Sequence, residues 1–443
     1  MKEPDIPESP VPVYATLEDW ILHESIPFSL DSPESLNAAV DKLVASLDPR
    51  VELLGFGEAL HGGEEILMLR NRLFQYLVQK HGYSAIAIES SFPRGHGVNE
   101  YVAGHGPASF EAVQETGFSH GFGRLGANRE LVEWMLQYNA DPSHPVKVRF
   151  YGFDSPTEMS GGDSPRQLLQ FVLGYLDSVD PAIGREHRGR IEPLLGKDAD
   201  WERTATIPDP VNSPDLSPDT TGSIRIETET LITELRQRRT DLVAKSDESQ
   251  YQEAAHYASL ALQLLDYHTV LAQKSRDRIA RILGLRDVMM ADNLEYMVAR
   301  ERGRGKVFAF AHNSHLQRGP ARWQMGRNLL TWRSAGLHLE EKLGPGYAVI
   351  GSLVGISEEN GIGQPEAGTP EALLAAVPGT VLFIPTYRGE GLPAPAIAAL
   401  PVRSGSAKNP TYFPLTPQSL TDFDWLAVLD STGYSRGGPQ LPG

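Results

Sequence analysis

Residues 51–61 read VELLGFGEALH, a short apolar run that ends in two ionisable side chains, Glu58 and His61. Three further runs end in the same way: SAIAIES (84–90) at Glu89, VKVRFYGFD (146–154) at Asp154 and KVFAFAH (306–312) at His312. Short runs rich in Val, Ile and Phe are typical of buried β-strands. The sequence therefore predicts strands whose carboxyl ends carry acids and histidines.

Helical patterns separate these runs along the chain. Residues 64–82 and 128–139 show apolar side chains at helical spacing, and Gly82 suits a left-handed helix cap. Three more apolar runs, at 347–355, 380–387 and 425–430, raise the number of predicted strands to seven. Alternating strands and helices predict an α/β fold with a mainly parallel central sheet flanked by helices.

We expect a single catalytic domain over residues 1–443, with a helical insertion at 164–302 that covers the cleft. That segment contains several amphipathic helical patterns and no convincing strand. Within it, residues 207–222 are rich in Pro, Ser and Asp, which predicts a mobile surface loop. Residues 437–443, GGPQLPG, predict a second loop at the end of the chain.

Composition excludes several kinds of chemistry. The 443 residues contain no Cys, so there is no disulfide, no thiolate nucleophile and no Cys-bound metal. The formal net charge of −17 and the lack of a dense basic run argue against nucleic acid as a partner. The acidic, Pro-rich first 20 residues do not resemble a signal peptide, and no apolar stretch is long enough to span a membrane. We therefore expect a cytoplasmic protein that acts on a small molecule.

Ligands of parallel α/β sheets bind outside the carboxyl ends of the strands. If the four runs are neighbours, two histidines and several carboxylates meet there, as general acid–base catalysis requires. Among the nearby polar residues, we select Asp154, His120 and His315 as candidates for substrate binding. Acids lining the cleft would favour a substrate that carries an amine.

Two glycine motifs have weaker support. Residues 117–121, GFSHG, match the G-x-S-x-G nucleophile elbow, and residues 121–126 match G-x-G-x-x-G, but no apolar strand precedes either. A glycine-rich active-site loop fits both better. His256 and His268 lie in the helical region, where a structural role is favoured. A metal site built from Glu58, His61, Glu89 and His312 stays open as an alternative, although no tight ligand pair is present.

An ordered set of motifs resembles the erythromycin esterase family, from about Leu17 to Asp430. It comprises GFGEALHGGEEILMLRNRLF (55–74), SAIAIES (84–90), FYGFDS (150–155), RDVMMADNLEYM (286–297), VFAFAHNSHL (307–316), MGRNLLTW (325–332) and LGPGYAVIGSLVG (343–355). The chain departs from the usual first motif at Leu60 and Gly63, where the family usually has Thr. These positions frame the catalytic loop and bear on which substrate is admitted.

The resemblance implies a role for each matching residue. His61 corresponds to the general base that activates water, Glu89 to a carboxylate that orients it, and Glu58 and Arg70 to the supporting acid and arginine. His312 corresponds to a second essential histidine, so that Arg70 or His312 would donate to the oxyanion or leaving group. No cofactor, metal or covalent serine is implied, although more distant relatives use a metal. Oligomeric state is not indicated.

Three functions follow as hypotheses. The first is a hydrolase that opens a macrolactone or related cyclic ester, in antibiotic resistance or in natural-product metabolism, by His-activated water; a metal-dependent hydrolase is its variant. The second is a natural-product biosynthetic enzyme that uses the same His and Glu residues for elimination, epimerisation or cyclisation. The third is a protein that binds its ligand without catalysis.

Overall fold

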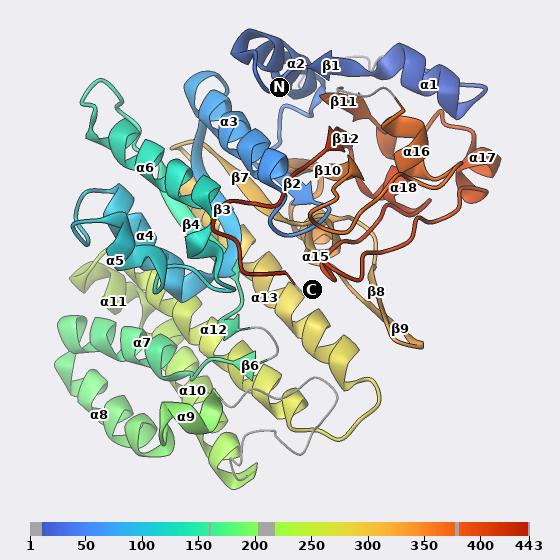
Figure 1. Cartoon of the computed structure of the whole chain (residues 1–443). Helices are drawn as coiled ribbons and strands as arrows, with labels where there is room; N and C mark the ends of the chain where they lie inside the picture. The colour runs from blue at the N-terminus through green and yellow to red at the C-terminus, as the bar shows by residue number, and fades with distance from the viewer. Residues whose placement is uncertain (1–10, 159–160, 203–217, 377–380, 442–443) are drawn as a thin grey trace, which may run out of the picture.

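The computed structural model describes residues 11–158, 161–202, 218–376 and 381–441. A central sheet of eight strands crosses the molecule (Figure 1). Its strand order is β1 (Ile26–Phe28), β11 (Val381–Pro385), β12 (Trp425–Ser431), β10 (Tyr347–Ile356), β2 (Leu53–Glu58), β7 (Lys306–His312), β3 (Tyr83–Ser91) and β4 (Arg149–Asp154). The six strands from β12 to β4 are parallel, and β11 runs antiparallel to both of its neighbours.

The predicted mainly parallel α/β sheet is confirmed, and all seven predicted strands belong to it. The eighth strand, β1, has only three residues, too few to show a periodic pattern in the sequence. Two hairpins lie outside the sheet: β5 (Thr157–Glu158) with β6 (Gly161–Gly162), and β8 (Ala321–Met325) with β9 (Asn328–Trp332).

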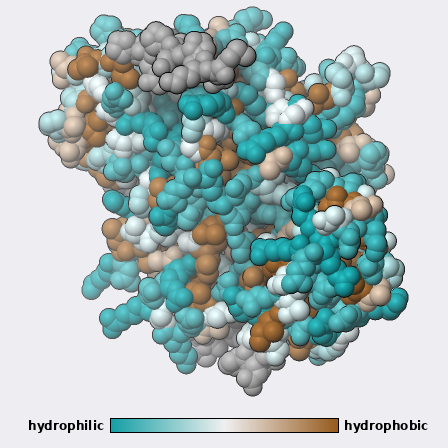
Figure 2. All heavy atoms as spheres, turned by 180° about the vertical axis from the view of Figure 1, so that it is seen from behind, coloured by the Kyte–Doolittle hydropathy of each residue, from teal (hydrophilic) through white to brown (hydrophobic). Residues whose placement is uncertain are grey.

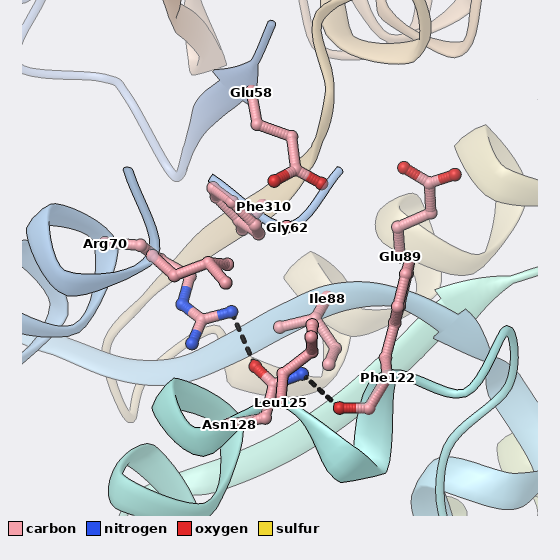
Figure 3. A pocket seen from close by; sticks show the side chains of 10 residues that line it. Glu58, Gly62, Arg70, Ile88, Glu89, Phe122, Leu125, Asn128 and Phe310 are labelled. Carbon is pink, nitrogen blue, oxygen red and sulfur yellow. Dashed lines mark hydrogen bonds between the residues drawn. The ribbon is translucent and has the colours of Figure 1, made fainter. Parts of the chain in front are cut away.

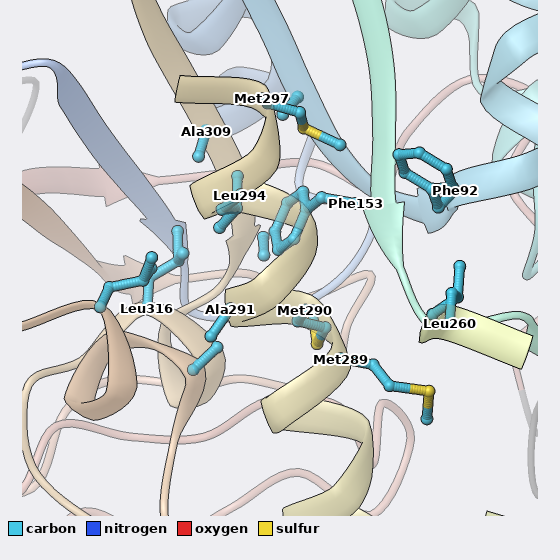
Figure 4. Packing of buried hydrophobic residues seen from close by; sticks show 14 of the residues in the cluster. Phe92, Phe153, Leu260, Met289, Met290, Ala291, Leu294, Met297, Ala309 and Leu316 are labelled. Atoms are coloured by element: carbon cyan, nitrogen blue, oxygen red, sulfur yellow. The ribbon is translucent and has the colours of Figure 1, made fainter. Parts of the chain in front are cut away.

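Alternating side chains of each strand build two separate hydrophobic cores. Leu54 and Phe56 of β2 belong to one core, together with residues of α2 (Pro33–Ser46), α3 (Glu64–Lys80), α4 (Phe92–Val102), α5 (Phe110–Gln114) and α6 (Gly126–Ala140). Leu53 points to the other core, where helices pack on the opposite face. There α13 (Arg278–Glu301) places Ala291, Leu294 and Met297 near Phe153 of β4 and Ala309 of β7 (Figure 4). The sheet is thus covered on both faces, as a parallel sheet requires.

A run of helices separates β6 from β7 in the part of the chain that the structure describes. It consists of α7 (Arg166–Val179), α8 (Pro181–Ile191), η2 (Glu192–Leu194), α9 (Asp198–Trp201), α10 (Pro218–Gln237), α11 (Arg239–Lys245), α12 (Glu248–Leu271) and α13. Of the predicted loop at 207–222, residues 207–217 lie outside the described residues. The prediction is wrong for 218–222, because α10 begins at Pro218, and proline is well tolerated in a first helical turn.

Shorter elements complete the chain: α1 (Leu17–Glu24), η1 (Phe122–Arg124), α14 (Asn313–Leu316), α15 (Ala335–Leu343), η4 (Gly344–Gly346), α16 (Pro370–Leu374), η5 (Tyr387–Gly389), α17 (Ala394–Ala398) and α18 (Ser419–Asp422). The two helices predicted after the first strands are α3 and α6, and Gly82 has the expected positive φ of 72°. None of the helices described could cross a membrane on its length and hydropathy. Figure 2 shows hydrophilic residues over most of one face, with hydrophobic residues in small groups between them.

Candidate active site

The four strands that end in ionisable residues are neighbours, in the order β2, β7, β3, β4. In the register of the sheet, Glu58 lies beside His312, and Ser91, two residues after Glu89, lies beside Asp154. The carboxyl edge of these strands therefore collects the side chains that the sequence places at the strand ends. Most of them are buried, so their mutual distances govern their protonation.

His61 lies in the turn between β2 and α3, three residues after Glu58. Its Nδ1 donates to Oε1 of Glu58 at 2.6 Å, and its Nε2 lies 3.9 Å from Oε1 of Glu89. The side chain keeps 26% of its surface exposed, so the ring is partly open to solvent. Burial alone would lower the pKa of His61, but the charges of Glu89 and Glu58 outweigh burial and raise it.

Glu58 has one carboxylate oxygen on His61 and one without a protein partner. Its Oε2 is buried and accepts no hydrogen bond from any residue that the structure describes. Burial raises the pKa of Glu58, and the hydrogen bond from His61 offsets part of this effect. Glu58 lines a small pocket of about 10 Å³, close to the space that one water molecule needs (Figure 3).

Arg70 of α3 lines the same pocket from below but does not contact Glu58 directly (Figure 3). Its guanidinium donates to Oδ1 of Asn71 and, at 2.8 Å, to Oδ1 of Asn128, and it lies over the ring of Phe310. Burial lowers the pKa of Arg70 to about 10, so it remains a cation at neutral pH. Its N–H groups make hydrogen bonds to neighbouring side chains, so its effect on the site is through its positive charge.

Glu89 is the centre of the cluster. Its Oε2 accepts a hydrogen bond from the backbone N–H of His312 at 2.8 Å, and its Oε1 accepts one from Nη2 of Arg286 at 2.8 Å. Nε2 of His315 lies 3.4 Å from the same Oε1. Burial would raise the pKa of Glu89, but the charges of His315, His61 and Arg286 hold it well below its ordinary value.

Arg286 of α13 is a site residue that sequence reasoning missed. It makes two hydrogen bonds to Asp154, from Nε at 2.8 Å and from Nη2 at 2.7 Å, in addition to its bond to Glu89. Despite burial, these contacts lower the pKa of Asp154. Because Glu89 and Asp154 are both paired with Arg286, neither carboxylate stands free for the cationic substrate that the charge of the chain suggests.

His120 and Phe122 bring the glycine-rich segment to the site. Nε2 of His120 lies 2.9 Å from Oδ2 of Asp154, and the ring of Phe122 lies 5.3 Å from that of His61. His120 has a φ of 58°, a left-handed conformation that non-glycine residues adopt at a cost and often at functional sites.

His315 lies on α14, three residues after His312, and is held by a buried acid. Its Nδ1 lies 2.6 Å from Oδ1 of Asp287, whose Oδ2 accepts the indole N–H of Trp332 at 2.8 Å. Burial would lower the pKa of His315, but the charges of Asp287 and Glu89 raise it to about 10. His315 is therefore an imidazolium at neutral pH. Asp287 and Trp332 were not predicted as site residues from the sequence either.

His312 differs from the other two histidines because neither of its ring nitrogens contacts a carboxylate. Nδ1 lies 2.7 Å from the hydroxyl oxygen of Ser314 and accepts the backbone N–H of the same residue at 3.1 Å, and Nε2 lies 2.9 Å from the carbonyl oxygen of Thr411. Burial and the neighbouring charge of His61 lower the pKa of His312 to about 3. His312 is therefore neutral at the pH of the cell.

Ser119, His256 and His268, which the sequence does not favour as catalytic residues, have other hydrogen-bond partners. Ser119 is buried against Ser90 and Ser91, and helix α5 rather than a strand precedes it, so the nucleophile elbow is absent. His256 bonds Asn293 and stacks on Tyr296, while His268 bonds the carbonyl oxygen of Asp163.

The alternative metal site lacks a converging ligand set. Among the residues described, no group of three or more His, Asp or Glu side chains is arranged to hold a metal ion. His61 turns Nδ1 to Glu58, and His312 turns one ring nitrogen to Ser314 and the other to the carbonyl oxygen of Thr411. A metal bound by all four candidates would therefore require the ring of His312 to reorient.

Comparison with known proteins agrees with this architecture. A type II erythromycin esterase from Escherichia coli is 22% identical over 338 residues, which cover 75% of this chain and 76% of that protein. A crystal structure of a Bacillus cereus protein has a TM-score of 0.73 at 19% identity and covers 96% of this chain and 98% of its own. A succinoglycan biosynthesis protein has a TM-score of 0.69 at 22% identity over 95% of this chain and 98% of its own.

A variant of the erythromycin esterase EreC, crystallised in its open conformation, has a TM-score of 0.66 at 18% identity and covers 93% of this chain and 98% of its own. At these identities the structures show a shared fold. The erythromycin esterase family model matches residues 78–432, a range that contains Glu89, Asp154, His312 and His315 and begins after His61. Because this match spans more than half of the sequence, the chain belongs to the erythromycin esterase family.

Proposed function

We propose that this protein is a hydrolase that opens a macrolactone or related cyclic ester with a water molecule activated by His61. The observation that carries the proposal is the Glu58–His61 pair, in which Nδ1 is held at 2.6 Å by a buried carboxylate while Nε2 lies 3.9 Å from Oε1 of Glu89, on a ring that is partly open to solvent. A histidine whose one nitrogen is fixed by an acid presents the other as a base. Membership of the erythromycin esterase family supports ester hydrolysis as the reaction.

In this proposal the attacking water lies against Nε2 of His61 and Oε1 of Glu89. These atoms are 3.9 Å apart, too far for a direct hydrogen bond but close enough for one water to contact both. Glu89 is ionised and orients the water, and His61 takes its proton. The charge of Glu58 then stabilises the imidazolium that forms.

Positive charge next to this position would stabilise the oxyanion. Both His315 and Arg286 contact Glu89. Nε2 of His315 lies 3.4 Å from Oε1 of Glu89, and Nη2 of Arg286 lies 2.8 Å from the same oxygen. As an imidazolium, His315 can also donate a proton to the alkoxide that leaves when the ring opens. Arg70 adds a buried positive charge behind Glu58, although its own donors are committed to Asn71 and Asn128.

No serine is required as a nucleophile in this scheme. Ser119, which matches the elbow motif, is buried and hydrogen-bonded to the backbone N–H of Ser91. The hydrogen bonds that its hydroxyl makes in the described structure go to Ser90 and Ser91, and neither of these residues is a base. Water attacks the ester directly, and no covalent acyl-enzyme forms.

The proposal is tested by incubating the protein with macrolides of 14- and 16-membered rings and following product mass, with and without a chelator. A product heavier by one water in both conditions supports it. A product of unchanged mass, or one lighter by water, would indicate epimerisation or elimination instead. Loss of activity with chelator, restored by added metal, would indicate the metal-dependent variant, and binding without turnover would indicate a non-catalytic protein.

A further inference from the structure

We propose that His312 is a positioning residue, which holds the segment Asn409–Phe413 against the His61 turn and exchanges no proton with the substrate. The inference deepens the proposed function, because it concerns how His61 is kept in place for that reaction. It differs from the role of proton donor that the resemblance suggests for His312.

The protonation state of His312 follows from its partners. Nδ1 lies 3.1 Å from the backbone nitrogen of Ser314, whose N–H can only donate, and 2.7 Å from the hydroxyl of Ser314, which can donate as well; both contacts are made when Nδ1 is unprotonated. A carbonyl oxygen can only accept, so Nε2, which lies 2.9 Å from the oxygen of Thr411, must carry the hydrogen. A second proton on Nδ1 could be donated to the hydroxyl of Ser314 but would remove the acceptor for the Ser314 N–H. The neutral ring with hydrogen on Nε2 is the form that keeps all three contacts.

The surroundings of His312 also oppose a second proton. The ring is buried, and the charged groups that face it are His61, Glu89 and His315. Burial is the largest effect on the pKa of His312 and lowers it; the cation of His315 lowers it as well, whereas the carboxylate of Glu89 offsets part of this effect. The ring of Phe413 packs edge-on against His312 at 4.7 Å and excludes solvent from that side.

Thr411 connects His312 to the His61 turn. Its carbonyl oxygen accepts a hydrogen bond from Nε2 of His312, and its hydroxyl oxygen accepts one from the backbone N–H of His61 at 3.0 Å. The same hydroxyl donates to Oδ1 of Asn409 at 2.7 Å, and Nδ2 of Asn409 reaches the carbonyl of His61 at 3.3 Å. Both backbone polar groups of His61 are therefore held by a segment that His312 fixes in place.

Substitutions at His312 separate the two roles. Glutamine can place an amide N–H where Nε2 lies, but it cannot titrate; asparagine is too short to reach Thr411 and can replace only the acceptor for Ser314. A positioning role predicts that His312→Ala and His312→Asn lower kcat about 10- to 100-fold, as loss of an outer contact does, with little change in KM. His312→Gln should recover most of that loss. A proton donor would instead leave all three variants about 10²- to 10⁴-fold slower.

Thr411 provides the matched test of the connection. Thr411→Val keeps the carbonyl that binds His312 but removes the hydroxyl that binds His61, so kcat should fall while KM stays near the wild-type value. Thr411→Ser restores the hydroxyl and should restore kcat. Equal activity of Thr411→Val and wild type would overturn the proposal.

A readout without substrate separates this inference from the proposed function. Nitrogen NMR of the labelled protein reports which ring nitrogen of each histidine carries a proton, with His312→Gln used for assignment. His312 should stay neutral, with hydrogen on Nε2, from pH 5 to pH 8. Titration of His312 within this range, or a hydrogen on Nδ1, would overturn the inference even if the protein proves to be a hydrolase, whereas failure to hydrolyse macrolides would leave this result unaffected.

Discussion

At the scale of single residues, the site depends on three histidines that the protein keeps in different states. His61 is partly exposed and has two acids beside it, His315 is fixed as a cation by Asp287, and His312 is neutral between Ser314 and the carbonyl of Thr411. Their pKa values diverge because their partners differ, although all three rings lie at one edge of the sheet. In the proposed mechanism this divergence would supply a base and an acid within one cluster.

Changing Glu58 to Gln should move the acid side of the pH–rate profile. His61 must be unprotonated to act as a base, so kcat/KM rises as the pH passes through the pKa of His61, which lies above its ordinary value of about 6.5. Removal of the Glu58 charge lowers that pKa, and the rise should move to lower pH while kcat falls. Glu52→Gln, at the other end of β2, is the control. A rise that stays in place or moves to higher pH in Glu58→Gln would contradict the assigned pair.

At the scale of elements, helix α13 joins the fold to the chemistry. Its apolar side chains pack on the sheet, and two adjacent residues, Arg286 and Asp287, reach Asp154, Glu89 and His315. Removal of the Asp287 charge by Asp287→Asn should lower the pKa of His315 from about 10. The fall of kcat at high pH, where His315 loses its proton, should then begin at lower pH. An unchanged basic side of the profile would show that His315 is not the acid.

Helix α4 supports β4 through a close contact between two glycines. A Cβ on Gly95 would lie 2.4 Å from the backbone nitrogen of Gly152, so Gly95→Ala must push α4 away from the strand that ends in Asp154. We expect a loss of about 1–3 kcal/mol in the free energy of unfolding, measured by urea denaturation.

Gly97→Ala is the matched control for Gly95→Ala, because it lies on the same helix with nothing within 4 Å of the added Cβ. It should leave stability unchanged or raise it by about 0.5–1 kcal/mol, since Ala favours helix. Equal effects of the two changes would contradict the contact.

The sequence predicts the strands and their ionisable ends well, because both depend on local patterns. Adjacency of β2, β7, β3 and β4 then brings Glu58, Glu89, Asp154 and His312 together. Arg286, Asp287 and Thr411 escape prediction, because they come from a helix and a loop whose approach to the site depends on packing of the whole chain. The hydrogen-bond partners of the two ring nitrogens of His312 could not be predicted for the same reason.

At the scale of the whole molecule, the buried charges make stability depend on pH. Glu89 and Asp154 have lowered pKa values, so they stabilise the fold above the unfolded carboxylate pKa of about 4, and this contribution is lost as pH falls. His315 has a raised pKa, so its contribution is complete below the unfolded histidine value of about 6.5 and is lost as pH rises towards 10. Stability should therefore be greatest between these limits.

Thermal melting of wild type and Asp154→Asn across pH tests this account. Asn cannot supply the charge that Arg286 requires, so its Tm should lie below wild type at pH 7, and the gap should shrink as pH falls from about 5 to 2. Asp48→Asn is a suitable control. Asp48 pairs with Arg50 at the surface, where solvent screens the charges, so its effect on Tm should be small. A gap that is constant with pH would contradict the role of the buried charge.

The central claim is that His61 activates water to open a cyclic ester. The most direct measurement incubates a macrolide with the protein in water labelled with heavy oxygen, in the presence of chelator, and compares wild type with His61→Ala and with the exposed-surface control His23→Ala. We predict one labelled oxygen in the product carboxylate for wild type and His23→Ala, and no product above background for His61→Ala. Equal labelled product from His61→Ala, or a product without label, would contradict the account.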